Sequence, residues 1–296
     1  MLAGVTAYGL FQLFKGDWRS AFGYWRGKGP LLCGALALQA VDISFDSFLW
    51  LLILREFDIR LDKKIAPLVF VSGYAGLLLP LQLGRFIRSE TIARLRLGHL
   101  GDAARGELVF FSLTAVAAVA VLAGVAVYAV CPWAAPIASC VVIGVALFSA
   151  DRVFRLLSKT PLKLPPGFWR RGRLFAVAFL AMFGWLINGT LLYLVAHDLP
   201  GDVKLWQALF VGPANLVLGS STGLPGGIGA VEGLLGVSLT LLHVPSNHLA
   251  LAVGAFRLVT FWAWIPVGWA AFSLVNRLAA RKRPAEAKES EAGHGQ

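Results

Sequence analysis

Two stretches of this chain, residues 108–130 and 174–196, run for 23 positions each without a charged residue. About 20 consecutive apolar residues suffice for a helix to cross a bilayer. The composition agrees, since 57% of the residues are hydrophobic and 15% are charged, against roughly 25% charged in soluble domains. The sequence therefore predicts an all-α polytopic membrane protein and argues against a soluble enzyme.

The basic residues lie in short loops between the apolar segments, which explains the formal net charge of +11 without a nucleic-acid partner. Residues 81–107 carry five Arg, residues 151–173 carry seven Lys or Arg, and the tail from residue 277 carries five. The intervening loops at 131, 197–204 and 243–248 carry one basic residue, Lys204, among them. By the positive-inside rule the basic loops are cytoplasmic, so we expect a multi-pass protein of the inner (cytoplasmic) membrane with its C-terminus inside.

Two apolar segments, 66–97 and 205–243, are interrupted by Gly, Pro and small polar residues. Irregular backbone at membrane depth must be shielded by protein or water, so each is expected to form a re-entrant helical hairpin, the first from the cytoplasm and the second from the exterior. Both contain the spacing Leu-Pro-x-x-x-Gly, and three apolar spans separate them. An odd number of crossings inverts the second hairpin relative to the first, as in inverted-repeat transporters.

The resulting organisation is one integral membrane domain over residues 1–276 and a basic, then polar tail over 277–296 that is expected to be disordered. Residues 15–29 carry four basic residues on what would be the exterior side. We therefore interpret them as an amphipathic segment lying on the membrane surface.

The glycine-rich stretch 219–232 is the strongest candidate for a functional site. Glycines free the backbone there, and a proline can open a helix whose first amides bind an anion. The alternative, a hairpin tip in which glycines only permit close packing, is equally consistent with the sequence. The candidate substrate-path residues of the two tips are Pro80, Gly84, Ser220, Ser221, Thr222, Pro225, Gly226, Gly227 and Gly229.

Four charged residues at or near the hairpins are further candidate substrate-path residues. Arg85 and Arg88 would receive an anionic head group from the cytoplasm, and Glu232 with Arg257 would relay it at mid-depth. Glu232 and Arg257 lie 11 and 10 residues from the exterior loop, hence both roughly 15 Å deep, which predicts an ion pair or a shared polar site. Arg85 and Arg88 follow the first tip, where guanidinium groups suit bidentate contacts with phosphate.

Gln39, Asp42 and Asp46 share one face of the span 30–54, because they are three and four residues apart. That face is interpreted either as a cation-accepting or proton-carrying stripe, or as charge balance for the arginines of the first hairpin. The three Cys and five His show no ligand spacing, so neither a metal site, a disulfide nor a cofactor is expected.

Residues 79–88, 224–233 and 257–262, which read LPLQLGRFIR, LPGGIGAVEG and RLVTFW, together resemble the lysylphosphatidylglycerol synthase transmembrane family, a flippase-like group. The resemblance implies two re-entrant hairpins and movement of a polar-headed lipid between leaflets. The chain departs from the family pattern at Gly84-Arg85, where the family often has Gly-Glu. The family also often has a Glu-Arg pair with a nearby Asp at the start of the next span. Of these residues, this chain keeps only Glu107. After residue 283 barely a dozen residues follow, so no aminoacyl-transferase domain is expected.

The leading functional hypothesis is therefore a lipid flippase or transporter without enzymatic activity. Its expected partners are membrane lipids with an anionic phospholipid or lipid-linked head group, together with a second copy of the chain or a lipid-synthesis enzyme. Two alternatives stay open: a membrane-embedded lipid-modifying enzyme using Asp42 and Asp46, and an accessory scaffold of a lipid-synthesis complex.

Overall fold

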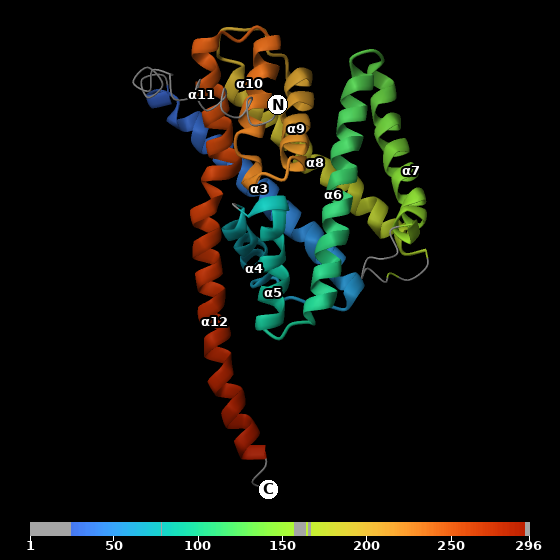
Figure 1. Ribbon diagram of the computed structural model, residues 1–296, viewed down its shortest axis with the longest axis vertical. Coiled ribbons are helices and arrows are strands. Elements are labelled where there is room, and N and C mark those ends of the chain that lie inside the picture. Colours follow the sequence, from blue (N-terminus) through green and yellow to red (C-terminus); the bar gives the residue numbers. More distant parts are fainter. Residues whose placement is uncertain (1–24, 78, 157–163, 165–166, 294–296) are drawn as a thin grey trace.

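The computed structural model describes residues 25–77, 79–156, 164 and 167–293, and these residues form helices with no β-strand among them (Figure 1). The all-α prediction is thereby confirmed. The long helices are α3 (Gly29–Leu54), α6 (Leu100–Tyr128), α7 (Ala135–Leu156), α8 (Gly172–Ala196), α9 (Leu205–Ser221) and α12 (Trp264–Gly293). The shorter ones are α4 (Ala66–Ser72), α5 (Phe86–Arg94), α10 (Ala230–Leu241) and α11 (Ser246–Arg257).

Five helical stretches among the described residues are long and apolar enough to cross a membrane. Three of them, α6, α7 and α8, separate the two broken segments, as the sequence predicts. Figure 1 places the α6–α7 and α10–α11 turns at one end of the molecule, and the α5–α6 turn and the end of α12 toward the other. The stretches are Gly29–Phe57, Leu100–Tyr128, Pro132–Ala150, Gly172–Ala196 and Ser246–Ala280.

Ion pairs tie the loops together at each end. Lys28, just before α3, donates to Asp198 in the loop after α8 at 2.6 Å, so α3 begins at the end that is poor in charge. At the other end Glu56 accepts hydrogen bonds from Arg171 and Arg173 at the start of α8. The predicted surface segment 15–29 lies mostly outside the described residues.

The segments 66–97 and 205–243 both turn back on themselves. In the first, α4 continues through the 3₁₀ helices η2 (Gly73–Gly76) and η3 (Pro80–Arg85) into α5; in the second, α9 leads through η6 (Pro225–Gly227) into α10. Figure 1 shows α4 and α5 below α9 and α10, and η3 and η6 are in contact. The folded-back shape agrees with the predicted hairpins, while their entry into a bilayer from opposite sides stays a prediction.

The two tips share a local conformation. Leu79 (φ −77°, ψ 141°) and Leu224 (φ −68°, ψ 146°) are extended, and in each case the following proline opens a 3₁₀ turn. This proline geometry follows from its fixed φ and missing amide donor. The repeated Leu-Pro motif therefore corresponds to a repeated backbone structure.

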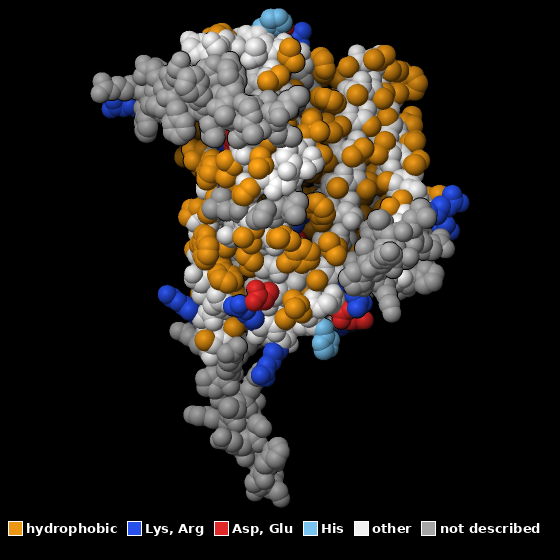
Figure 2. All heavy atoms as spheres, viewed as in Figure 1, with side chains coloured by type: hydrophobic (Ala, Val, Ile, Leu, Met, Phe, Trp, Pro, Cys, Tyr) orange, Lys and Arg blue, Asp and Glu red, His pale blue; other side chains and the backbone are white. Residues whose placement is uncertain are grey.

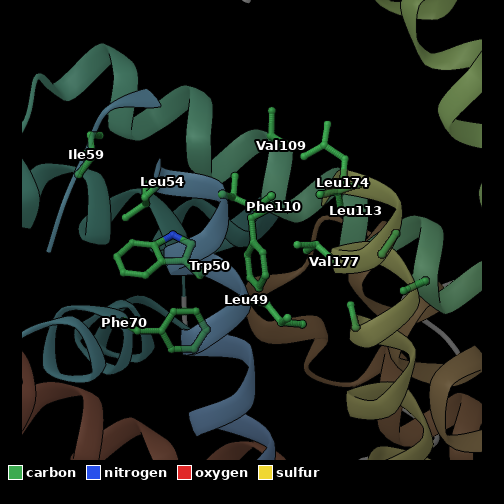
Figure 3. Packing of buried hydrophobic residues seen from close by; sticks show 14 of the residues in the cluster. Leu49, Trp50, Leu54, Ile59, Phe70, Val109, Phe110, Leu113, Leu174 and Val177 are labelled. Carbon is green, nitrogen blue, oxygen red and sulfur yellow. The ribbon is translucent and has the colours of Figure 1, made fainter. Parts of the chain in front are cut away.

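Buried side chains form two hydrophobic clusters, one centred on α3, α4, α6 and α8 and the other on α8, α10 and α11. In the first, Figure 3 shows the Trp50 indole beside the Phe70 ring, with ring centroids 5.6 Å apart in an edge-to-face arrangement. Phe110 from α6 packs on the same phenylalanine. These aromatic contacts hold α4 against the spans that surround it.

The outer surface is apolar over the middle of the face shown in Figure 2, with most of the visible charged side chains around its margin. This distribution is the one expected of a protein surrounded by lipid. The helix α12 continues to Gly293, into the tail for which the sequence predicts disorder. Residues 279–292 are rich in Ala, Glu, Lys and Arg, which are strong helix formers.

Candidate functional site

A cavity of about 250 Å³ lies where the two broken segments meet. Its walls come from the tips of both segments, from α3, α6 and α8, and from the middle of the last span. Lining residues belong to both hydrophobic clusters, so the cavity sits between them. Those with polar side chains are Gln39, Asp42, Asp46, Tyr74, Arg85, Arg88, Thr114, Trp185, Asn188, Ser220, Arg257 and Thr260.

Glu232 and Arg257 form the predicted ion pair. Nε of Arg257 donates to Oε1 of Glu232 at 2.6 Å, and both side chains are buried. Nη2 of Arg257 donates to the carbonyl oxygen of Gly226 at 3.0 Å, and the guanidinium lies 4.1 Å from the centre of the Phe261 ring. Arg257 thus fastens the second tip to the last span while lining the cavity.

The other carboxylate oxygen of Glu232 bears on the prediction that amides at the start of this helix bind an anion. Oε2 accepts the amide of Gly229 at 2.6 Å, so Glu232 caps α10 from its own first turn. α10 begins at Ala230 rather than at Pro225, because Gly226 and Gly229 adopt positive φ values of 58° and 83° between them. The amide of Gly229, expected to bind an anion, is therefore occupied by the protein itself.

A second buried pair, which the sequence reading did not identify, holds the first tip. Nη1 of Arg88 donates to Oε1 of Glu107 at 3.0 Å, and Nε donates to the carbonyl oxygen of Phe70 at 2.9 Å. The Arg88 guanidinium lies 3.7 Å from the centre of the Phe70 ring. Trp50 donates its indole hydrogen to the second oxygen of Glu107 at 2.8 Å.

The two pairs are built alike with their charges exchanged. After the first tip the returning helix supplies the arginine and the next span supplies Glu107; after the second tip the returning helix supplies Glu232 and the next span the arginine. Each arginine also binds a backbone carbonyl and a phenylalanine ring of its own region. The sequence shows only a glutamate near the start of a span, which does not identify its partner.

Glycines bring the backbones of each tip together. A Cβ on Gly84 would overlap the carbonyl group of Gly76, and a Cβ on Gly227 would lie 3.2 Å from the carbonyl group of Gly219. Because these backbone segments touch, a side chain cannot be added without moving the two segments apart. The close-packing interpretation of the glycines is thus supported in both tips.

The remaining predicted residues divide into two groups. Gln39, Asp42 and Asp46 line the cavity together, as do Arg85, Arg88, Gly84, Ser220, Gly226, Gly227 and Arg257. Ser221 and Thr222 instead donate to the carbonyl oxygens of Leu218 and Gly219 at the end of α9. Pro225 and Gly229 are not among the residues that line the cavity. The side chain of Pro80 is outside what the structure describes.

After Arg257 the last span contains one π-helical turn, Leu258–Trp262. Trp264, just after this turn, donates its indole hydrogen to the carbonyl oxygen of Val259 at 2.7 Å. The turn directs Thr260 and Phe261 toward the cavity. Within the described part of the chain, no group of three or more His, Cys, Asp or Glu side chains is arranged to hold a metal ion.

Comparison with known proteins gives one informative result. The family model described as the lysylphosphatidylglycerol synthase TM region matches residues 2–268. No curated protein matches the chain.

Proposed function

Because the chain belongs to the lysylphosphatidylglycerol synthase transmembrane family, we propose that this multi-pass membrane protein moves a polar-headed lipid between the two leaflets. The head group would pass through the cavity between the two tips, and the acyl chains would remain in the lipid phase. The proposal includes an inner-membrane location and a cytoplasmic C-terminus, for which the basic loops argue.

The cavity is the single observation that carries this proposal. A volume of about 250 Å³ corresponds to roughly eight water molecules at about 30 Å³ each, enough for a small head group. Its polar lining includes three arginines, and guanidinium groups bind phosphate in bidentate fashion. A polar compartment of this kind lowers the cost of carrying a head group across hydrocarbon.

The arginines are assigned different roles. Arg85 is half-buried at the cavity wall, with its guanidinium 4.8 Å from the centre of the Phe111 ring, and we assign it the first contact with the phosphate. Arg88 and Arg257 are almost completely buried and bind a glutamate and a carbonyl oxygen each. They position the two tips.

Alternating access would come from movement of one folded-back segment against the other. The two tips contact each other. The three spans between them would give the halves opposite orientations in the membrane. Inverted halves with broken helices near the midplane are a recurrent transporter architecture. Each half has its own buried ion pair, Arg88–Glu107 in the first and Glu232–Arg257 in the second. These pairs would let each half move as a unit.

The test is leaflet exchange of a fluorescent phospholipid in liposomes containing the purified protein. Arg85→Ala should reduce the protein-dependent exchange rate at least tenfold, whereas Arg94→Ala, at an exposed position, should leave it unchanged. Equal rates for Arg85→Ala and the unaltered protein would reject the assigned role. Exchange equal to that of protein-free liposomes would reject the flippase.

The same liposomes distinguish transport from lipid modification. Mass spectrometry of the lipids recovered after the assay should find them chemically unchanged. Conversion of the lipid by the purified protein alone would instead support the membrane-embedded enzyme. Co-purification with a synthase, without exchange activity, would support the accessory scaffold.

A further inference from the structure

One wall of the cavity, formed by α3 and α8, is lined by oxygen atoms. Gln39, Asp42 and Asp46 lie on one face of α3, and Gly184 and Asn188 lie one turn apart on α8. The helices approach closely because Gly184 has no side chain: a Cβ there would be 2.6 Å from Oδ1 of Asp42 and 3.7 Å from Oδ1 of Asp46. Two carboxylates therefore face α8 at one level.

Several of these oxygens are buried without a hydrogen-bond partner among the described residues: Oε1 of Gln39, Oδ1 of Asp42 and Oδ1 of Asn188. Gln39 and Asn188 are only 7% and 8% exposed. The amide of Gln39 donates to Oδ2 of Asp42 at 2.9 Å, which fixes its oxygen as the unpaired atom. Buried oxygens without a donor are costly unless something positive binds them.

The charges around the cavity are also unbalanced. Arg88 and Arg257 are compensated by Glu107 and Glu232, respectively. The charged residues that remain on the lining are Asp42, Asp46 and Arg85. With every group in its usual ionised form these three sum to one negative charge, so one monovalent cation would make the cavity neutral.

We propose that Asp42 and Asp46, with the side-chain oxygens of Gln39 and Asn188, form a binding site for one alkali metal ion. Carboxylate and amide oxygens are the ligands that hard cations prefer. Arg85 on the same lining offsets one of the two carboxylate charges, so the site suits an ion of single charge. The two amide oxygens give the site more acceptors than a proton would need. The ion would occupy the α3–α8 wall, across the cavity from the tips.

This site has a consequence that rests on the proposed function. An anionic head group entering the cavity would add further negative charge to a compartment that already carries an excess. Binding of the cation reduces that repulsion, so ion and head group should enter together. The alkali ion would then be the coupling ion of lipid movement.

The site can be tested without any transport measurement. The purified protein is placed in nanodiscs of phosphatidylglycerol, which carries no amine, and its thermal unfolding is followed in NaCl and in N-methyl-D-glucamine chloride of equal ionic strength. Sodium should raise the unfolding temperature in a saturable manner, because a ligand that binds only the folded state stabilises it. Radioactive sodium should bind to about one site per chain.

Asp42→Asn and Asn188→Ala should each weaken sodium binding at least tenfold. Asp202→Asn, which neutralises an exposed carboxylate in a loop, should leave it unchanged. Direct sodium binding to the unaltered chain keeps the test valid even where a variant does not fold. Absence of sodium binding, or binding that neither variant weakens, overturns the site.

Two further outcomes separate this inference from the flippase itself. Repeating the titration in phosphatidylethanolamine nanodiscs asks whether a head-group ammonium supplies the charge; stabilisation by the amine lipid and none by sodium would overturn the alkali-ion site. Sodium binding without lipid exchange would keep the site and reject the flippase. Lipid exchange without sodium binding would do the reverse.

Discussion

Removing both members of the Glu232–Arg257 pair should destabilise the protein no more than removing Arg257 alone. Glu232→Gln keeps the size of the side chain and an acceptor for the amide of Gly229, but leaves the Arg257 guanidinium without a counter-charge. Arg257→Met leaves the opposite problem, a carboxylate that is 8% exposed. Breaking a buried pair at one partner typically costs about 3–5 kcal/mol.

The contacts in the structure give a similar magnitude. Glu232 accepts one charge-assisted hydrogen bond from Arg257, worth about 1.5–3 kcal/mol, which Glu232→Gln weakens while keeping the cap on α10. We therefore expect a loss of about 3 kcal/mol for Glu232→Gln and about 4 kcal/mol for Arg257→Met. The double variant should lose about 4 kcal/mol rather than their sum, a coupling of roughly 3 kcal/mol.

The assay is reversible unfolding in mixed micelles, followed by tryptophan fluorescence for the four members of the cycle. A matched control is Glu90→Gln, which breaks the exposed pair with Arg94 and should change the free energy of unfolding by less than about 1 kcal/mol. If the single variants at Glu232 and Arg257 were as stable as the control, or their effects simply added, the two side chains would not act as a buried clamp.

Gly76→Ala should destabilise the first tip and slow lipid exchange, because its Cβ would overlap Gly84, whereas Gly144→Ala, with open space around the new atom, should be neutral in the same unfolding and exchange assays. Native Cys131 lies in the loop between α6 and α7 and should react with a membrane-impermeant maleimide from the exterior; labelling only from the cytoplasmic side would reverse the proposed topology. The hydrogen bond from Lys28 lowers the pKa of Asp198, so this contact contributes stability above the unfolded pKa of about 3.9 and loses it as the pH falls through the lowered value. Asp198→Asn should accordingly lower the unfolding temperature slightly at pH 7 and not at about pH 2, as a thermal scan at both values would show.

Part of the site could be predicted because depth in a membrane follows from counting residues along helices. Glu232 and Arg257 lie at similar distances from the same loop, residues 243–248, which was sufficient to predict an ion pair or a shared polar site. The face shared by Gln39, Asp42 and Asp46 was likewise visible from helical spacing, and all three line the cavity. These inferences used only local geometry.

Other features depended on how the helices pack. The Arg88–Glu107 pair joins residues on either side of the α5–α6 turn, and its partners Phe70 and Trp50 come from two further helices. Nothing in the linear pattern distinguishes Glu107 from an acidic residue at the membrane surface. In the same way, the expectation that the α10 amides are available to an anion was wrong for Gly229, because Glu232 folds back onto it.

The sequence by itself determined that this chain is a membrane protein, because that follows from the length of its apolar segments. It also determined which loops are basic, and it located the two helix breaks through the backbone properties of Gly and Pro. Only the tertiary structure decided that Arg88 pairs with Glu107 and that Asp42 and Asp46 face the cavity together with Arg85. The physical reason is that a charge in a low-dielectric interior is governed by partners within a few ångströms. Those partners come from helices far apart in the chain.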